Sequence, residues 1–195
     1  DGGGSLKTLH QKIVLSATYR QVSGAQGTPH AARALAVDSD NRLLWRQNRR
    51  KLEAEAIHDA VLAVSGKMNF QMGGPGYQDF VIEHPEHSPH YEYHLADPND
   101  ARTWRRSIYR FIVRSQTQPF MTSLDCADPS MRVERRNESV SAIQALALLN
   151  NGFMVAQAGH FAVRVSRDAG DDPLRQVERA FQLAIGRGPT AEERE

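Results

Sequence analysis

The sequence has 195 residues, which is enough for one domain with a hydrophobic core. Hydrophobic residues make up 40% and charged residues 24%, as in an ordinary globular protein. The 24 Lys and Arg residues nearly balance the 23 Asp and Glu residues, so the net charge is only +1. The chain therefore lacks the positive field that nucleic-acid binding needs, and we expect no nucleic-acid partner. No apolar run is long enough to predict a membrane span.

Cys126 is the only cysteine, which excludes an intrachain disulfide, and there is no Cys-x-x-Cys-His haem motif. We therefore expect no cofactor on this segment. The first residues, Asp1-Gly2-Gly3-Gly4, do not resemble a signal peptide. Thr190 and Glu193 have capping-box spacing, which predicts a helix beginning close to the last residue. From this we expect the sequence to be a piece of a longer protein.

The first part of the chain, residues 1–66, is predicted to be helical. Apolar residues at helical spacing predict a helix over 6–19, and 31–37 suits a short turn of helix. The clearest helix covers 52–65 and stops at Gly66. Its predicted apolar face is Leu52, Ala56, Ile57, Ala60, Val61 and Val64, with Lys51, Glu53, Glu55, His58 and Asp59 on the polar face.

Residues 67–115 predict a small antiparallel β insertion. The glycine-rich stretch 72–76 indicates a turn, and 79–82 and 91–95 suit short strands. The nearly continuous β-branched and aromatic run over 108–113 predicts a buried strand.

Residues 116–138 show no period and are predicted to be irregular, whereas 139–195 return to helical spacing. Helices over 52–65, 139–150, 153–166 and 173–185 are expected to share one core, because their apolar stripes need a partner. The predicted fold class is mainly α with a small antiparallel β insertion (α+β), with a helical core and a single domain over 1–195.

Several stretches resemble a known family. SLKTLHQKIVLSATYRQ, NRLLWRQNRRKLEAEAIHDAVLAVSG, MGGPG, RRSIYRFIVRSQ, LDCADPSMRVERRNESVSAIQALALLNN and RAFQLAIGRGPTAEE are similar to a planctomycete domain of unknown function that lies C-terminal to cytochrome c-type domains. Gly4 stands where that family usually has a tryptophan, and the family's N-terminal part is missing. The chain therefore resembles the C-terminal majority of the domain.

The resemblance implies an exported multidomain parent protein in the periplasm or cell envelope. It implies that the partners are other domains of the same parent chain, and that a haem would belong to a neighbouring domain. It supplies no catalytic residues.

An acidic turn followed by arginines is the first candidate site, with Asp125, Asp128, Arg135 and Arg136 as its central residues. In a catalytic site, a carboxylate would act as acid or base while the arginines hold an anionic group. Alternatively, the aspartates cap loop amides and the arginines tie the segment to the helices. We favour this structural alternative, and we expect Cys126 to be a buried thiol.

A histidine-rich stretch is the second candidate. His84, His87, His90 and His94 lie near Glu83, Glu86 and Glu92, and such side chains can bind zinc. The alternative is a solvated hairpin loop, because a loop containing prolines does not pre-orient metal ligands.

Arginines interleaved with aromatic residues over 102–114 suggest an anionic polysaccharide as a further partner. Our main functional hypothesis is a structural, docking or recognition module of an exported, cytochrome-associated protein. The alternative is part of a cell-envelope enzyme that acts on an anionic or carbohydrate substrate.

Overall fold

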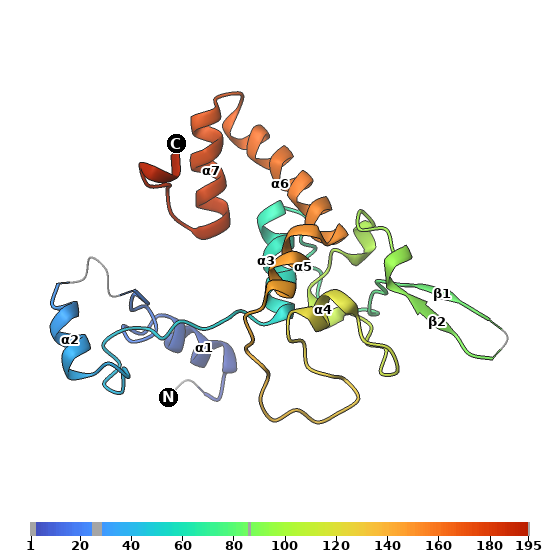
Figure 1. Ribbon diagram of the computed structural model, residues 1–195, viewed down its shortest axis with the longest axis horizontal. Coiled ribbons are helices and arrows are strands. Elements are labelled where there is room, and N and C mark those ends of the chain that lie inside the picture. The colour runs from blue at the N-terminus through green and yellow to red at the C-terminus, as the bar shows by residue number, and fades with distance from the viewer. Residues whose placement is uncertain (1–2, 25–28, 86, 195) are drawn as a thin grey trace. The chain divides into compact units, whose positions relative to one another are not determined.

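A computed structural model describes residues 3–24, 29–85 and 87–194 (Figure 1). The chain divides into two compact units, Asp1–Lys51 and Leu52–Glu195, and each is described by itself. The expectation of a single domain over 1–195 stays a prediction.

The first unit contains helices α1 (Leu6–Val14) and α2 (Ala31–Val37). Ser5 caps α1 by accepting a hydrogen bond from the Thr8 amide. The helix is shorter than the predicted 6–19, because the Ser16 hydroxyl donates to the Ile13 carbonyl and accepts from the Tyr19 amide. These bonds turn the chain out of the helix.

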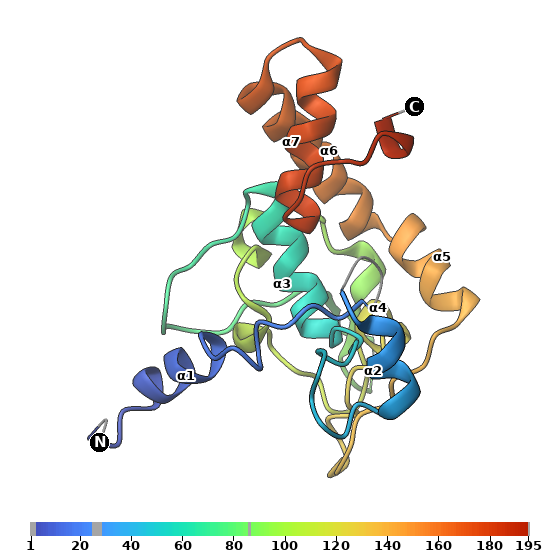
Figure 2. The ribbon, with the colours of Figure 1, turned by 90° about the vertical axis from the view of Figure 1, so that its left-hand side faces the viewer.

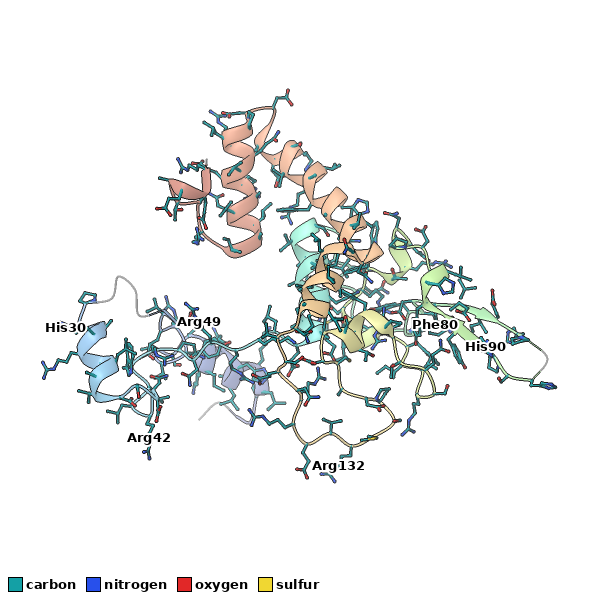
Figure 3. All side chains as sticks on the ribbon, in the orientation of Figure 1. His30, Arg42, Arg49, Phe80, His90 and Arg132 are labelled. Carbon is teal, nitrogen blue, oxygen red and sulfur yellow. The ribbon has the colours of Figure 1, made fainter. Side chains whose placement is uncertain are left out.

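A polar turn, and not an apolar core, organises the described part of the first unit. Asn41 is buried and its side chain bonds both the carbonyl and the amide of Arg46. The Asp38 carboxylate accepts from the amides of Arg42 and Leu43 at 2.9 and 2.7 Å. Arg42 and Arg49, labelled in Figure 3, lie in this unit. The apolar side chains of α1 remain exposed.

The second unit holds the hydrophobic core. Its helices are α3 (Ala54–Ser65), α4 (Pro119–Ser123), α5 (Ala142–Asn150), α6 (Gly152–Ala169) and α7 (Pro173–Ile185). The buried residues Ala54, Phe120, Met121 and Leu124 form the centre of the core, and side chains from α5 and α6 cover them. The predicted mainly α fold with a helical core is confirmed.

The predictions of individual helices need two corrections. Residues 116–138 were expected to be irregular, but α4 forms there because Gln118 caps it and Pro119 occupies its first position. Helix α7 was expected to share the core, yet it has no fully buried residue, and α6 is its main packing partner (Figure 2).

The buried face of α3 also differs from the prediction. It consists of Ala54, His58, Leu62 and Ser65, so His58 lies on the inner face and not on the polar one. Polar bonds hold this face in place: the Ser65 hydroxyl donates to Gln157 of α6 at 2.7 Å.

Strands β1 (Val81–Glu83) and β2 (His90–Glu92) form the predicted antiparallel hairpin, with Ile82 opposite Tyr91. The strand predicted over 91–95 is wrong beyond Glu92, because Tyr93–Leu95 form a 3-10 helix. Figure 3 shows Phe80 at the root of this hairpin and His90 further along it. Phe80 packs edge-on against Tyr91 and Tyr93, so an aromatic cluster anchors the hairpin.

The predicted strand over 108–113 is wrong. Residues Ser107–Tyr109 form a 3-10 turn, and Ile108 is 77% exposed. The amide and the hydroxyl of Ser107 both donate to Asp59 of α3 and hold the turn in place. Only an isolated backbone pairing with Tyr77 follows, since Phe111 donates to the Tyr77 carbonyl at 2.8 Å.

Arg105 fixes the glycine-rich turn. Its guanidinium donates to the carbonyls of Gly73, Pro75 and Gln71 at 2.6, 2.6 and 3.2 Å. It also lies 4.1 Å from the ring centre of Tyr109. The turn at 71–76 is therefore held by a side chain about 30 residues later in the chain.

Over the described ranges, none of the helices combines the length and the apolar character that crossing a membrane requires.

Candidate functional site

A cavity of about 440 Å³ opens in the second unit between α3, α4, the start of α6 and the segments that flank the hairpin. We call it the Asp79 pocket. Its polar and aromatic walls include His58, Tyr77, Asp79, Tyr93, Arg110 and Gln118. A cavity of this size falls within the range of ligand-binding pockets.

Asp79 is a polar group of this pocket with one unsatisfied oxygen. Its Oδ1 atom is buried and has no hydrogen-bond partner among the described residues. Burial raises the pKa of Asp79, although the positive charge of Arg110 opposes the shift. The Tyr77 hydroxyl is also buried, with no hydrogen-bond partner in the part of the chain that the structure describes, and burial raises its pKa. Two buried polar atoms thus lack partners on the same wall.

Two polar groups and one aromatic ring hold the His58 side chain in place. Its Nδ1 lies 3.2 Å from Asp59 Oδ1 and 3.0 Å from Ser107 Oγ. Its ring stacks on Phe153 of α6 with ring centres 4.6 Å apart. Three groups from three segments therefore fix the orientation of the imidazole.

Asp59 links α3 to the 3-10 turn. Its Oδ1 accepts from the Ser107 amide at 2.7 Å and from the Ser107 hydroxyl at 2.8 Å. Burial alone would raise the pKa of Asp59, but the hydrogen bonds from His58 and Ser107 outweigh it and hold the pKa below its ordinary value. Asp59 is therefore an ionised carboxylate beside His58.

A second, smaller cavity of about 200 Å³ shares Tyr93, Arg110, Gln118 and Met121 with the Asp79 pocket. Its polar wall contains an ion pair between Arg136 and Glu55, in which Nη2 of Arg136 donates to Oε1 of Glu55 at 2.9 Å. The Cys126 thiol points its sulfur at the same Glu55 oxygen, 3.7 Å away. Burial and the Glu55 charge raise the pKa of Cys126, so the thiol is a poor nucleophile.

The four residues of the predicted acidic site do not meet in one place. Asp128 and Arg136 line the smaller cavity. The Asp125 carboxylate instead accepts from the amide and hydroxyl of Ser139, and Arg135 is exposed. The Asp128 carboxylate also caps the Ser130 amide at 2.8 Å. Catalysis by these residues stays a prediction.

The four histidines of the predicted metal site are exposed. His94 lies 3.3 Å from Glu92 and also lines the Asp79 pocket. Within residues 3–24, 29–85 and 87–194, no three His, Cys, Asp or Glu side chains are grouped closely enough to bind a metal ion. Glu86, named with these histidines, lies outside the described residues. The metal site stays a prediction.

Sequence reasoning missed Asp79, Tyr77 and His58 as pocket residues. One available signal was the spacing of Ala54, His58 and Leu62, which places the histidine in the middle of a helix face. No comparable signal marked Asp79, because its partners come from distant segments.

Neither the comparison with curated proteins nor the comparison with solved structures gave a match. The comparison with family models matched residues 1–195 to a family described as PSD1, protein of unknown function (DUF1553). This agrees with the resemblance to a domain of unknown function, and the chain belongs to the PSD1 (DUF1553) family.

Proposed function

We propose that the second unit is a recognition module that binds a hydroxyl-rich carbohydrate in the Asp79 pocket. The observation that carries the proposal is the buried Asp79 oxygen, which has no partner among the described residues. A buried acceptor of this kind costs free energy unless a donor reaches it. A sugar hydroxyl would supply that donor.

The other walls of the pocket suit the same ligand. Tyr93 and Phe153 offer aromatic surface, and Gln118 and Arg110 add planar polar groups. Sugar rings combine an apolar C–H face with hydroxyl groups that donate and accept. The pocket thus offers aromatic surface for the C–H face and polar groups for the hydroxyls.

The charges of the pocket favour a neutral sugar over a strongly anionic polysaccharide. Arg110 is accompanied by the carboxylates of Asp79 and Asp97 on the same walls. A polyanion would meet both carboxylates at close range, and this repulsion costs free energy in a partly buried site. The proposal therefore differs from the anionic polysaccharide expected from the sequence, which stays a prediction.

The cellular setting of the proposal comes from the family resemblance alone. We propose that the module works in an exported protein of the periplasm or cell envelope, beside other domains of the same parent chain. A cytochrome c-type domain among these neighbours would hold any haem.

Titration of the purified protein with a panel of neutral and acidic oligosaccharides, followed by calorimetry, tests the proposal. Asp79→Ala should weaken binding at least about tenfold, because a hydrogen bond to a charged group contributes about 1.5–3 kcal/mol. Asp128→Ala is the matched control, since Asp128 is an exposed carboxylate outside the pocket. Equal binding by both variants, or no binding by the folded wild type, would refute the proposal.

A further inference from the structure

We propose that His58 is a general base in the Asp79 pocket and that the unit hydrolyses a carboxylic ester carried by the bound carbohydrate. This inference rests on the proposed function, because it assigns chemistry to the same pocket.

The hydrogen bonds around His58 determine its tautomer. Asp59 Oδ1 lies 3.2 Å from Nδ1, and an ionised carboxylate only accepts hydrogen bonds. An unprotonated Nδ1 would point its lone pair at this carboxylate, and the two acceptors would repel each other. A protonated Nδ1 instead donates to Asp59, while the Ser107 hydroxyl donates to the same oxygen at 2.8 Å. The neutral ring therefore carries its proton on Nδ1.

The remaining nitrogen, Nε2, then carries the free lone pair. His58 lines the Asp79 pocket, and the described residues form no hydrogen bond with Nε2. The stack on Phe153 keeps the ring from rotating away. An imidazole oriented through Nδ1 and basic at Nε2 is the arrangement that a general base requires.

The same geometry excludes a serine nucleophile. Ser107 Oγ lies on the Nδ1 side of the ring, 3.0 Å from that nitrogen, and shares that side with Asp59. In a Ser-His-Asp triad the serine lies at the nitrogen opposite the aspartate. Ser107 is therefore not the nucleophile, and we assign that role to a water molecule.

The reaction balances with water and the ester alone. Nε2 takes one proton from water as the water oxygen attacks the ester carbonyl carbon, and the carbonyl oxygen becomes negatively charged. Arg110, the arginine of the pocket wall, would stabilise that charge. The tetrahedral intermediate then releases the sugar oxygen, which takes the proton back from the imidazolium. The products are a carboxylic acid and a sugar hydroxyl.

Ester hydrolysis fits this set of groups better than cleavage of a glycosidic bond. Glycosidases usually work with a pair of carboxyl groups on either side of the scissile bond. The pocket walls also carry Asp79 and Asp97, but the group that hydrogen bonds and stacking hold in a fixed orientation is the His58 imidazole. Asp59 acts as a positioning residue, because it acts on the ligand through His58.

The test measures acetate release from an acetylated oligosaccharide and hydrolysis of p-nitrophenyl acetate. His58→Gln should lower kcat/KM at least about 100-fold, the usual contribution of a general base. His160→Gln is the matched control, because His160 also packs against an aromatic ring, that of Trp104, and contacts Asn99. Asp59→Asn should lower kcat with little change in KM, since it disturbs the tautomer and not the binding walls.

A wild type no faster than buffer, or equal losses in both histidine variants, would overturn the inference. Nitrogen NMR of wild-type His58 gives a readout that needs no variant: the proton should be on Nδ1, and a proton on Nε2 would overturn the proposal. Carbohydrate binding without ester hydrolysis would remove this inference and leave the proposed function standing. Loss of binding itself would remove the proposed function.

Discussion

Replacing Asp125 by alanine should destabilise the second unit, because this side chain ties a long loop to the start of α5. Its carboxylate accepts from the Ser139 amide at 2.8 Å, the Ser139 hydroxyl at 2.9 Å and the Gln144 amide group at 3.1 Å. Asp125 also has a φ of 65°, which an aspartate tolerates better than an alanine.

The loss can be estimated from these contacts. Bonds to a charged acceptor contribute about 1.5–3 kcal/mol each but do not add fully, and the left-handed backbone costs alanine about 1 kcal/mol more. We expect Asp125→Ala to lower the free energy of unfolding by about 3 kcal/mol. Asp125→Asn should lose less, because asparagine keeps one acceptor oxygen and tolerates the backbone.

Urea unfolding followed by circular dichroism measures this difference. Asp128→Ala is the control, because that carboxylate is exposed and bonds only within its own turn to Ser130; we expect little change. If Asp125→Ala unfolds at the same urea concentration as Asp128→Ala, the hydrogen bonds of Asp125 to Ser139 and Gln144 do not stabilise the unit, and the reasoning is wrong. If it also abolishes activity while stability is unchanged, the catalytic prediction for this turn gains support.

Four further predictions concern other parts of the unit. Burial would raise the pKa of Glu55, but the hydrogen bonds from Arg136 outweigh burial and hold the pKa below its ordinary value. The ionised Glu55 therefore stabilises the fold. This stabilisation is complete above the unfolded-state pKa and is lost as the pH falls through the folded-state pKa. Urea midpoints measured down to pH 3 should therefore fall less steeply for Glu55→Gln, and parallel curves would contradict this. A Cβ at Gly76 would lie 2.9 Å from a backbone carbonyl oxygen, so Gly76→Ala should cost about 1–3 kcal/mol. Gly159→Ala, in open space within α6, should raise the melting temperature, and a lower one would count against the packing argument. If the histidines at 84–94 bind zinc, the purified protein should retain one equivalent after dialysis; metal analysis that finds none would end that prediction.

Local sequence signals predicted the helices well where capping and spacing agreed. Helix α7 begins after Asp172 and ends before Gly186, as the capping preferences of aspartate and glycine indicate. The existence of the hairpin was predicted because aromatic and β-branched residues flank a proline-containing loop, but its strand bounds were not. These elements depend on neighbours in the sequence, and that is why the sequence alone was sufficient.

The run at 108–113 shows where local reasoning fails. Its composition suits a strand, but a strand needs a partner of matching length, and only an isolated pairing with Tyr77 is present. Ser107 is instead committed to Asp59, 48 positions earlier in the chain. The Asp79 pocket escaped prediction for the same reason, since long-range pairing assembles its walls.

Arg105 gives the glycine-rich turn an anchor of a different kind from the Glu55–Arg136 pair. Its guanidinium is held by backbone carbonyls, and these oxygens do not titrate where carboxylates do, while arginine keeps its charge. Acid that protonates Glu55 and breaks its ion pair with Arg136 therefore leaves the hydrogen bonds from Arg105 to the 71–76 turn intact. As the pH falls, the loop that carries Arg136 loosens first, and the turn clasped by Arg105 persists.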